Sequence, residues 1–150
     1  MSGIRDKIID FYAQMGKPFE MRDFVLLWMR AWVAKIFYDS GRTKAGENYW
    51  EINDFQGTLF EEEYGISFID PELAAQLALY AETILPIMVF VGVASRLGAL
   101  GLVGMTLFIQ LFVYPNHFTD HVTWIAALGM ILCMGPGKLS LDHFFNKSQK

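Results

Sequence analysis

Two long segments in the second half of the chain are apolar on every side. Residues 73–94 (LAAQLALYAETILPIMVFVGVA) contain Glu82 as their one charged side chain, and residues 97–114 (LGALGLVGMTLFIQLFVY) contain none. A helix of a water-soluble domain would show a polar stripe every 3.6 residues, and neither segment does. The first segment is 22 residues long, which as a helix gives about 33 Å and matches a bilayer core of about 30 Å. We therefore predict that both segments are transmembrane helices.

Two further segments are less uniformly apolar, so the prediction of a transmembrane helix is weaker for them. Residues 117–135 are largely apolar and stop at the run Gly135-Pro136-Gly137, where proline and glycine end a helix. Residues 22–40 are apolar except for Arg30 and Lys35 in their interior. Each of these charges costs about 2.5 to 3.5 kcal/mol at the centre of a transmembrane helix. The four segments together predict one all-α domain over residues 1–150, an integral membrane four-helix bundle.

The distribution of basic residues predicts how this bundle is oriented. If the N-terminus is cytoplasmic, eight of the 12 Lys and Arg residues lie inside and only Arg42 and Lys44 lie outside. Such a bias is typical of cytoplasmic loops in membrane proteins. We therefore expect both termini inside, the loop of residues 39–72 outside, and Arg30 and Lys35 within the membrane.

The outer loop of residues 39–72 is acidic. It has nine Asp and Glu residues against Arg42 and Lys44, with aromatic residues spaced among them. Alternating aromatic and acidic residues favour a segment on the membrane surface, with the rings at headgroup level. Two interpretations stay open: a solvated interfacial loop, or a surface that docks a cation or a protein partner.

Composition excludes several classes of protein. With 53% hydrophobic and 19% charged residues, the chain is neither disordered nor a disulfide scaffold. Its formal charge of −4 and its lack of a basic stripe exclude a nucleic-acid binder. Cys133 is the single cysteine, so the chain has no dithiol that would pass electrons to a quinone.

Several motifs resemble the DoxX family of membrane proteins. The run LLWMRAWVAKIFYDSGRTK is similar to the first helix of that family, and AETILPIMVFVGVASRLGAL to its second. The closing run GPGKLSLDHF resembles the family's C-terminal motif. The residues that carry the first two matches are Arg30, Phe37, Gly41 and Lys44, and then Glu82, Gly92, Arg96 and Ala99.

The resemblance implies a multi-pass protein of the bacterial inner membrane. Relatives include membrane subunits linked to thiosulfate:quinone oxidoreductase, to maturation of methylamine dehydrogenase, and to secreted redox enzymes of mycobacteria. It therefore implies a redox-associated membrane subunit, which we interpret as a quinone-linked accessory subunit with a partner oxidoreductase. The resemblance leaves the cofactor open, and a bound quinone is the candidate. The alternative is a non-enzymatic anchor or assembly factor that docks a periplasmic protein through the acidic loop.

Charged residues at membrane depth are the main candidates for chemistry, because they persist only when paired, hydrated or functional. Counting residues along the helices places Arg30 or Lys35 close enough to pair with Glu82, and Pro86 leaves the Glu82 carbonyl without its helical donor. Either the ion pair fixes helix register, or it forms a quinone headgroup site or proton relay. The catalytic candidates are Glu82, Arg30 and Lys35, and the headgroup candidates are Arg30, Glu82, Tyr80 and Gln110.

A histidine pair and a glycine face are the remaining candidates. His117 and His121 have the i, i+4 spacing of metal ligands, but two ligands are incomplete, so headgroup contacts are the simpler interpretation and no metal site is expected. The glycines of residues 98–104 either close the bundle or support a homo-oligomer. Beyond the lipid bilayer, we expect a protein partner on the outer side.

Overall fold

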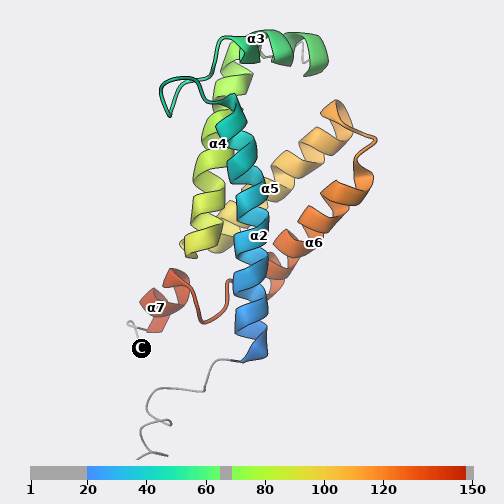
Figure 1. The fold of residues 1–150 in the computed structure, drawn as a ribbon. Coiled ribbons are helices and arrows are strands. Elements are labelled where there is room, and N and C mark those ends of the chain that lie inside the picture. Colours follow the sequence, from blue (N-terminus) through green and yellow to red (C-terminus); the bar gives the residue numbers. More distant parts are fainter. Residues whose placement is uncertain (1–19, 65–68, 148–150) are drawn as a thin grey trace, which may run out of the picture.

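The computed structural model of the protein describes residues 20–64 and 69–147 (Figure 1). The described residues form helices joined by loops, and they form no strand, which confirms the all-α prediction. One isolated β-bridge joins Ala45 to Ile52. The helices in chain order are α2 (Met21–Lys44), α3 (Phe55–Leu59), the π-helix η1 (Phe60–Tyr64), α4 (Pro71–Val91), α5 (Ser95–Phe108), the π-helix η2 (Ile109–Val113), α6 (Phe118–Met134) and α7 (Leu141–Lys147).

Two of the described helical segments are long and apolar enough to cross a membrane. They are α4, with 21 residues, and the continuous segment of α5 and η2, with 19, and both reach a mean hydropathy of 1.7. Only 33% of the α4 window and 22% of the α5 window is buried inside the protein. The core helix of a water-soluble protein would be mostly buried, so these helices present their apolar side chains outward as membrane helices do.

The four longest helices pack on one another in a ring of contacts. Helix α2 runs along α4, α4 contacts α5, α5 contacts α6, and α6 returns to α2 (Figure 1). Side chains from all four form the buried core, among them Phe37, Val89, Leu102 and Leu128. Helices α3 and α7 lie at opposite ends, which we call the α3 end and the α7 end.

The first helix is longer than hydropathy predicts. We expected a span over residues 22–40, but α2 continues to Lys44. Its buried residues recur every three or four positions, which is the spacing of one helix face, and they are Asp23, Leu26, Arg30, Val33, Ala34, Phe37, Gly41 and Lys44. Arg42 and Lys44 therefore belong to the helix and not to the acidic loop, because the last turn of α2 packs on α4.

Candidate functional site

The carboxylate of Glu82 on α4 forms a buried ion pair with Lys44 on α2. Lys44 Nζ lies 2.6 Å from Glu82 Oε2, and the two side chains are 10% and 4% exposed. Ser40, one turn before Lys44, accepts a hydrogen bond from Lys44 Nζ to its Oγ at 3.2 Å. The prediction that Arg30 or Lys35 pairs with Glu82 is therefore wrong, because the last turn of α2 supplies the cation instead.

A glycine lets the two helices meet at this point. A Cβ on Gly41 would lie 3.0 Å from Glu82 Cβ and 3.1 Å from Glu82 O, so any side chain there would push α2 away from α4. The Glu82 carbonyl lacks its usual helical donor because the residue four positions later is Pro86. The α2 backbone at Gly41 thus covers the carbonyl that Pro86 leaves free.

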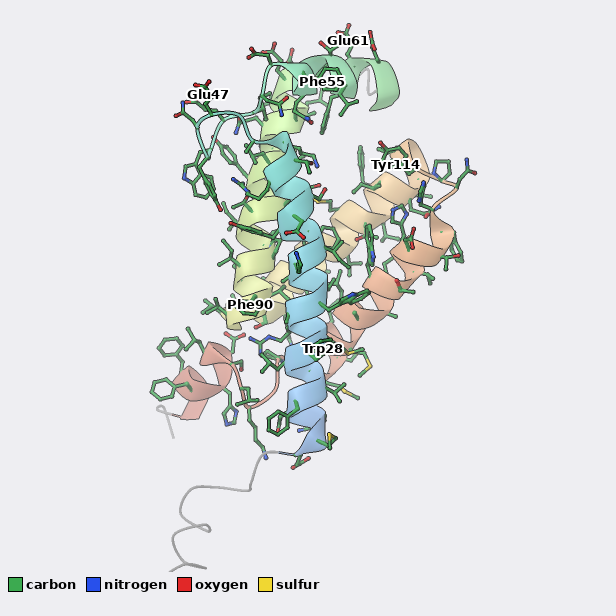
Figure 2. All side chains as sticks on the ribbon, viewed as in Figure 1. Trp28, Glu47, Phe55, Glu61, Phe90 and Tyr114 are labelled. Atoms are coloured by element: carbon green, nitrogen blue, oxygen red, sulfur yellow. The ribbon has the colours of Figure 1, made fainter. Side chains whose placement is uncertain are left out.

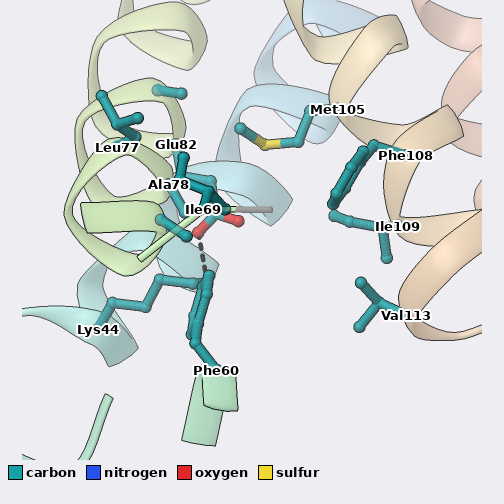
Figure 3. A pocket seen from close by; sticks show the side chains of 12 residues that line it. Lys44, Phe60, Ile69, Leu77, Ala78, Glu82, Met105, Phe108, Ile109 and Val113 are labelled. Carbon is teal, nitrogen blue, oxygen red and sulfur yellow. Dashed lines mark hydrogen bonds and ion pairs between the residues drawn. The ribbon is translucent and has the colours of Figure 1, made fainter. Parts of the chain in front are cut away.

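The ion pair borders an apolar pocket of about 340 Å³ (Figure 3). Among the described residues that line it, Lys44 and Glu82 alone are ionisable, and the others come from α4, from α5 and η2, and from the segment around Phe60. The volume lies at the lower end of the range for small-molecule sites, which bury an apolar ligand and orient it with a few polar groups. The arrangement therefore suits a small apolar ring with one hydrogen-bonding edge.

Arg30 lies elsewhere, at the α7 end, with its side chain fully buried. Its Nε donates to Val89 O at 2.8 Å, and its Nη2 donates to Phe90 O. Both carbonyls belong to the last turn of α4, where helical acceptors lack intrahelical donors and a positive charge is favourable. Arg30 thus caps the C-terminus of α4.

The other end of the same guanidinium holds the loop after α6. Arg30 Nη1 donates to Pro136 O at 3.0 Å and to Leu139 O at 2.8 Å. The Arg30 guanidinium has five N–H donors, and it makes four hydrogen bonds to backbone carbonyls. Arg30 is therefore a structural clamp between α4 and the loop, and it is not brought near Glu82.

Two aspartates hydrogen-bond the closing motif, GPGKLSLDHF (residues 135–144), to other segments at the α7 end. Asp142 accepts hydrogen bonds from Ala94 N, Ser95 N and Ser95 Oγ at 2.8 to 2.9 Å, which caps the N-terminus of α5. Burial alone would raise the pKa of Asp142, but these hydrogen bonds and the charge of Arg30 together lower its pKa below the ordinary value. Asp23 on α2 accepts from Lys138 N at 3.0 Å. The loop is thus tied to α2, α4 and α5.

A family model covers most of these features. The model named DoxX matches residues 25–115, more than half of the chain, and the match includes Arg30, Lys44 and Glu82. The chain belongs to the DoxX family. Searches of curated proteins and of solved structures returned no match. The matched range ends before Asp142, so the closing motif of this DoxX protein lies outside it.

The remaining headgroup candidates of the DoxX protein are not gathered around Glu82. Tyr80 is 39% exposed, and its ring lies 6.2 Å from that of Trp50. Gln110 in η2 donates to Pro115 O at 2.7 Å, and its Oε1 lies 2.6 Å from His121 Nδ1. Of the four predicted residues, only Glu82 lines the pocket.

Lys35 is exposed in this DoxX protein. Its Nζ lies 2.5 Å from Asp39 Oδ2 on the same helix, and the two side chains are 75% and 57% exposed. This catalytic candidate therefore lies on an outer face of α2, away from the pocket.

The structure places the predicted histidine pair at the start of α6, beside Asp120. The His117 and His121 rings are 6.3 Å apart, and Asp120 Oδ2 lies 3.5 Å from His117 Nδ1. Among the described residues, no group of three or more His, Cys, Asp or Glu side chains is placed to hold a metal ion. His121 instead packs on Trp124, with ring centroids 5.0 Å apart.

The segment between α2 and α3 is held against α4 by polar contacts. Gln76 of α4 donates to Trp50 O at 2.7 Å and accepts from Ile52 N at 3.3 Å. Arg42 donates to Tyr49 O at 2.9 Å and lies over the Tyr49 ring, 3.7 Å from its centroid. These contacts order a surface that carries Glu47, Phe55 and Glu61 at the α3 end (Figure 2). Residues 65–68 of the predicted outer loop lie outside the described residues.

Lys44 is the site residue that sequence reasoning misplaced. Lys44 belongs to the family motif, but hydropathy places it in the outer loop, because the apolar segment ends at the run DSGRTK. The spacing of Arg30, Phe37, Gly41 and Lys44 is seven, four and three residues, which is the spacing of one helix face. That periodicity was the signal that would have placed Lys44 on the face toward α4.

Proposed function

We propose that this DoxX protein is a multi-pass protein of the bacterial inner membrane that binds a quinone headgroup beside Glu82 and serves a partner oxidoreductase as an accessory subunit. The observation that carries the proposal is the apolar pocket of about 340 Å³ with the Lys44–Glu82 ion pair in its wall. A quinone matches this chemistry because it joins an apolar ring to carbonyl oxygens that accept hydrogen bonds. The redox association rests on the family resemblance.

In the proposed membrane placement, α2, α4, the α5–η2 segment and α6 all cross the bilayer. The α7 end, where α2 begins and α7 lies, is cytoplasmic, and the α3 end faces outward. Support comes from the outward apolar faces of α4 and α5 and from the bias of Lys and Arg residues along the sequence. Glu82 then lies near mid-depth, because α4 extends from Pro71 to Val91 on either side of it.

Each member of the ion pair has a distinct role. Lys44 Nζ donates to Glu82 Oε2 at 2.6 Å and makes two longer hydrogen bonds, to Ser40 Oγ at 3.2 Å and to Ser40 O at 3.4 Å. A carbonyl oxygen in the pocket would take over the donor of one of these longer bonds. Glu82 can give up or take a proton when a bound ring changes its redox state. The electrons come from the partner, because the chain has no flavin, nucleotide or iron–sulfur motif of its own.

The test is to purify the protein in mild detergent and measure extracted quinone per chain. We expect near-stoichiometric quinone in the wild type and at least a tenfold loss in Glu82→Gln and Lys44→Met. Glu47→Gln makes the same chemical change on an exposed residue outside the pocket and should retain quinone. Folding is checked by thermal unfolding, and a wild-type protein that carries no quinone from quinone-rich membranes would refute the proposal.

A second candidate function is the anchor that docks a periplasmic protein at the α3 end. The ordered acidic and aromatic surface around Glu47 and Phe55 favours it. Replacing Glu47, Glu51, Glu61 and Glu62 together by Gln should release such a partner without changing quinone retention. If the quadruple variant keeps the partner that purifies with the wild type, this candidate fails.

A further inference from the structure

An exposed ion pair on α2 lies beside the apolar helix α4. Lys35 and Asp39 are paired on α2, and both side chains are largely exposed. Lys35 also lines a groove of about 500 Å³ whose other wall includes Pro86, Ile87 and Phe90 of α4. Lys35 therefore borders a groove with an apolar wall, and its partner Asp39 lies one turn further along α2.

The depth of these charges follows from the packing of α2 on α4. Gly41 touches Glu82, so these two residues lie at one level. With a rise of about 1.5 Å per residue, Asp39 lies about 3 Å from that level and Lys35 about 9 Å, both toward the α7 end. Helix α4 continues for about 13 Å in that direction before it ends at Val91. Both charges therefore lie within the depth of α4.

Such a pair is costly against lipid in the membrane placement proposed above, on which this inference rests. A lysine near the end of a span can extend to the interface, but Lys35 Nζ turns toward Asp39, which lies deeper. The short side chain of Asp39 cannot reach either interface from near the middle of α4. The face that carries both charges needs a cover that supplies charged partners.

We infer that a second copy of this chain covers the groove, with a twofold axis along the membrane normal. Lys35 of each copy then pairs with Asp39 of the partner subunit. Such an axis brings identical residues to the same depth, and Lys35 and Asp39 are one turn, about 6 Å, apart along α2. A lysine side chain spans that distance, so two positive and two negative charges close into one ring. Ala31 and Ala34 line the groove and leave room for the second helix.

The second copy does not block the pocket beside Glu82. Among the described lining residues, none is shared by the groove and the pocket. Dimer formation and ligand binding are therefore separable in experiment.

The test uses two charge reversals that are complementary between copies. Lys35→Asp makes both positions negative, and Asp39→Lys makes both positive, so each variant alone should be a monomer with half the wild-type protein mass in detergent. Co-expressed with different tags, the two variants should form a mixed dimer that purifies through both tags. Glu47→Lys reverses an exposed charge outside the groove and should leave the dimer intact.

Cross-linking in native membranes provides a second readout that does not depend on detergent. In a Cys133→Ser background, Ala31→Cys should form a disulfide-linked dimer on oxidation, and Leu111→Cys, on the exposed surface of η2, should not. A monomeric wild type that lacks this cross-link, a dimer that tolerates both charge reversals, or a different protein cross-linked at Ala31 would overturn the inference. A wild-type monomer that retains quinone would refute only the dimer, whereas a mixed dimer without quinone would refute only the proposed ligand.

Discussion

Arg30 shows how one side chain joins segments that are distant in the sequence. Its acceptors lie 59 to 109 residues away along the chain, and all four are backbone carbonyls. The planar guanidinium has five N–H donors and reaches all four carbonyls at once, whereas an ammonium group has only three donors. Since every residue type has a carbonyl, nothing in the acceptor residues identifies them in the sequence.

Arg30→Lys should therefore lower the thermal stability of the protein markedly. Hydrogen bonds to charged groups contribute about 1.5 to 3 kcal/mol each, and lysine leaves at least one buried carbonyl without a donor. The midpoint of thermal unfolding in detergent measures the effect, with Arg96→Lys on the exposed start of α5 as the control. Equal midpoints for the two variants would contradict the clamp.

Gly92 is a second residue whose identity is dictated by its surroundings. It ends α4 at a φ of +81°, and a Cβ there would lie 2.5 Å from Ser140 Cβ and 2.7 Å from Arg30 Nη2. Both the backbone conformation and the clamp exclude a side chain at this position.

Gly92→Ala should destabilise the protein by at least about 2 kcal/mol, because the strain at positive φ adds to a clash with the clamp. Gly104→Ala is the matched control, since nothing lies within 4 Å of its added Cβ. That control should be neutral or slightly stabilising in the same unfolding measurement. A Gly92→Ala protein as stable as Gly104→Ala would show that the turn adapts.

At the scale of elements, the closing motif gives α5 an acidic N-terminal cap from a different part of the chain. Asp142 lies 47 residues after Ser95 and bonds both its backbone and its side chain. An ionised carboxylate at a helix N-terminus is favoured by the helix dipole as well as by these hydrogen bonds.

This cap predicts a pH dependence of stability. The pKa of Asp142 is held below its ordinary value of 3.8, so the carboxylate stabilises the folded state fully above that pH. The contribution is lost as pH falls through the lower pKa of the folded state. Asp142→Asn should be less stable than wild type at pH 7, and the difference should shrink as pH falls below about 4.

Unfolding midpoints measured from neutral to acid pH check this prediction. Asp120→Asn, on the exposed start of α6, is the control that should follow the wild-type curve. If the difference in unfolding midpoint between wild type and Asp142→Asn stays constant with pH, the charge of the Asp142 carboxylate does not cause it.

The helices themselves were largely predictable from sequence, but the end of α2 and the partner of Glu82 were not. Hydropathy located α4, α5 and α6 because their apolar faces point outward. It failed at residues 41–44, where Gly41 and Lys44 face another helix and not lipid. The sequence identifies Glu82 as a candidate because it is the one charged residue of an apolar segment. It does not identify Lys44 as the partner of Glu82, because that depends on how α2 is aligned against α4.

At the scale of the whole molecule, the two ends are built differently. The α7 end is closed by the Arg30 clamp and the two aspartates, whereas α5 and α6 diverge from α2 and α4 toward the α3 end (Figure 1). The pocket lies on the diverging side, between α4 and α5. Hydrogen bonds between distant segments thus hold the α7 end together, and the pocket lies where the helices separate.

The proposed orientation predicts different labelling of the two ends. In a Cys133→Ser background, a membrane-impermeant maleimide applied to spheroplasts should label Glu47→Cys, because that residue faces outward. His143→Cys, exposed at the α7 end, should react only after the membrane is opened. The reverse pattern would show that the protein has the opposite orientation, and labelling of both before opening would exclude the proposed placement.

The Arg30 clamp also has a consequence for biosynthesis. Two of the four acceptors of Arg30, Pro136 O and Leu139 O, leave the ribosome 106 and 109 residues after Arg30 itself. Until Pro136 and Leu139 have been synthesised, the nascent chain carries a guanidinium that lacks two of its four final acceptors. A chain truncated before Pro136 never gains these two acceptors. Its Arg30 side chain stays only partly hydrogen-bonded, and a membrane protease can recognise the incomplete protein by this exposed charge.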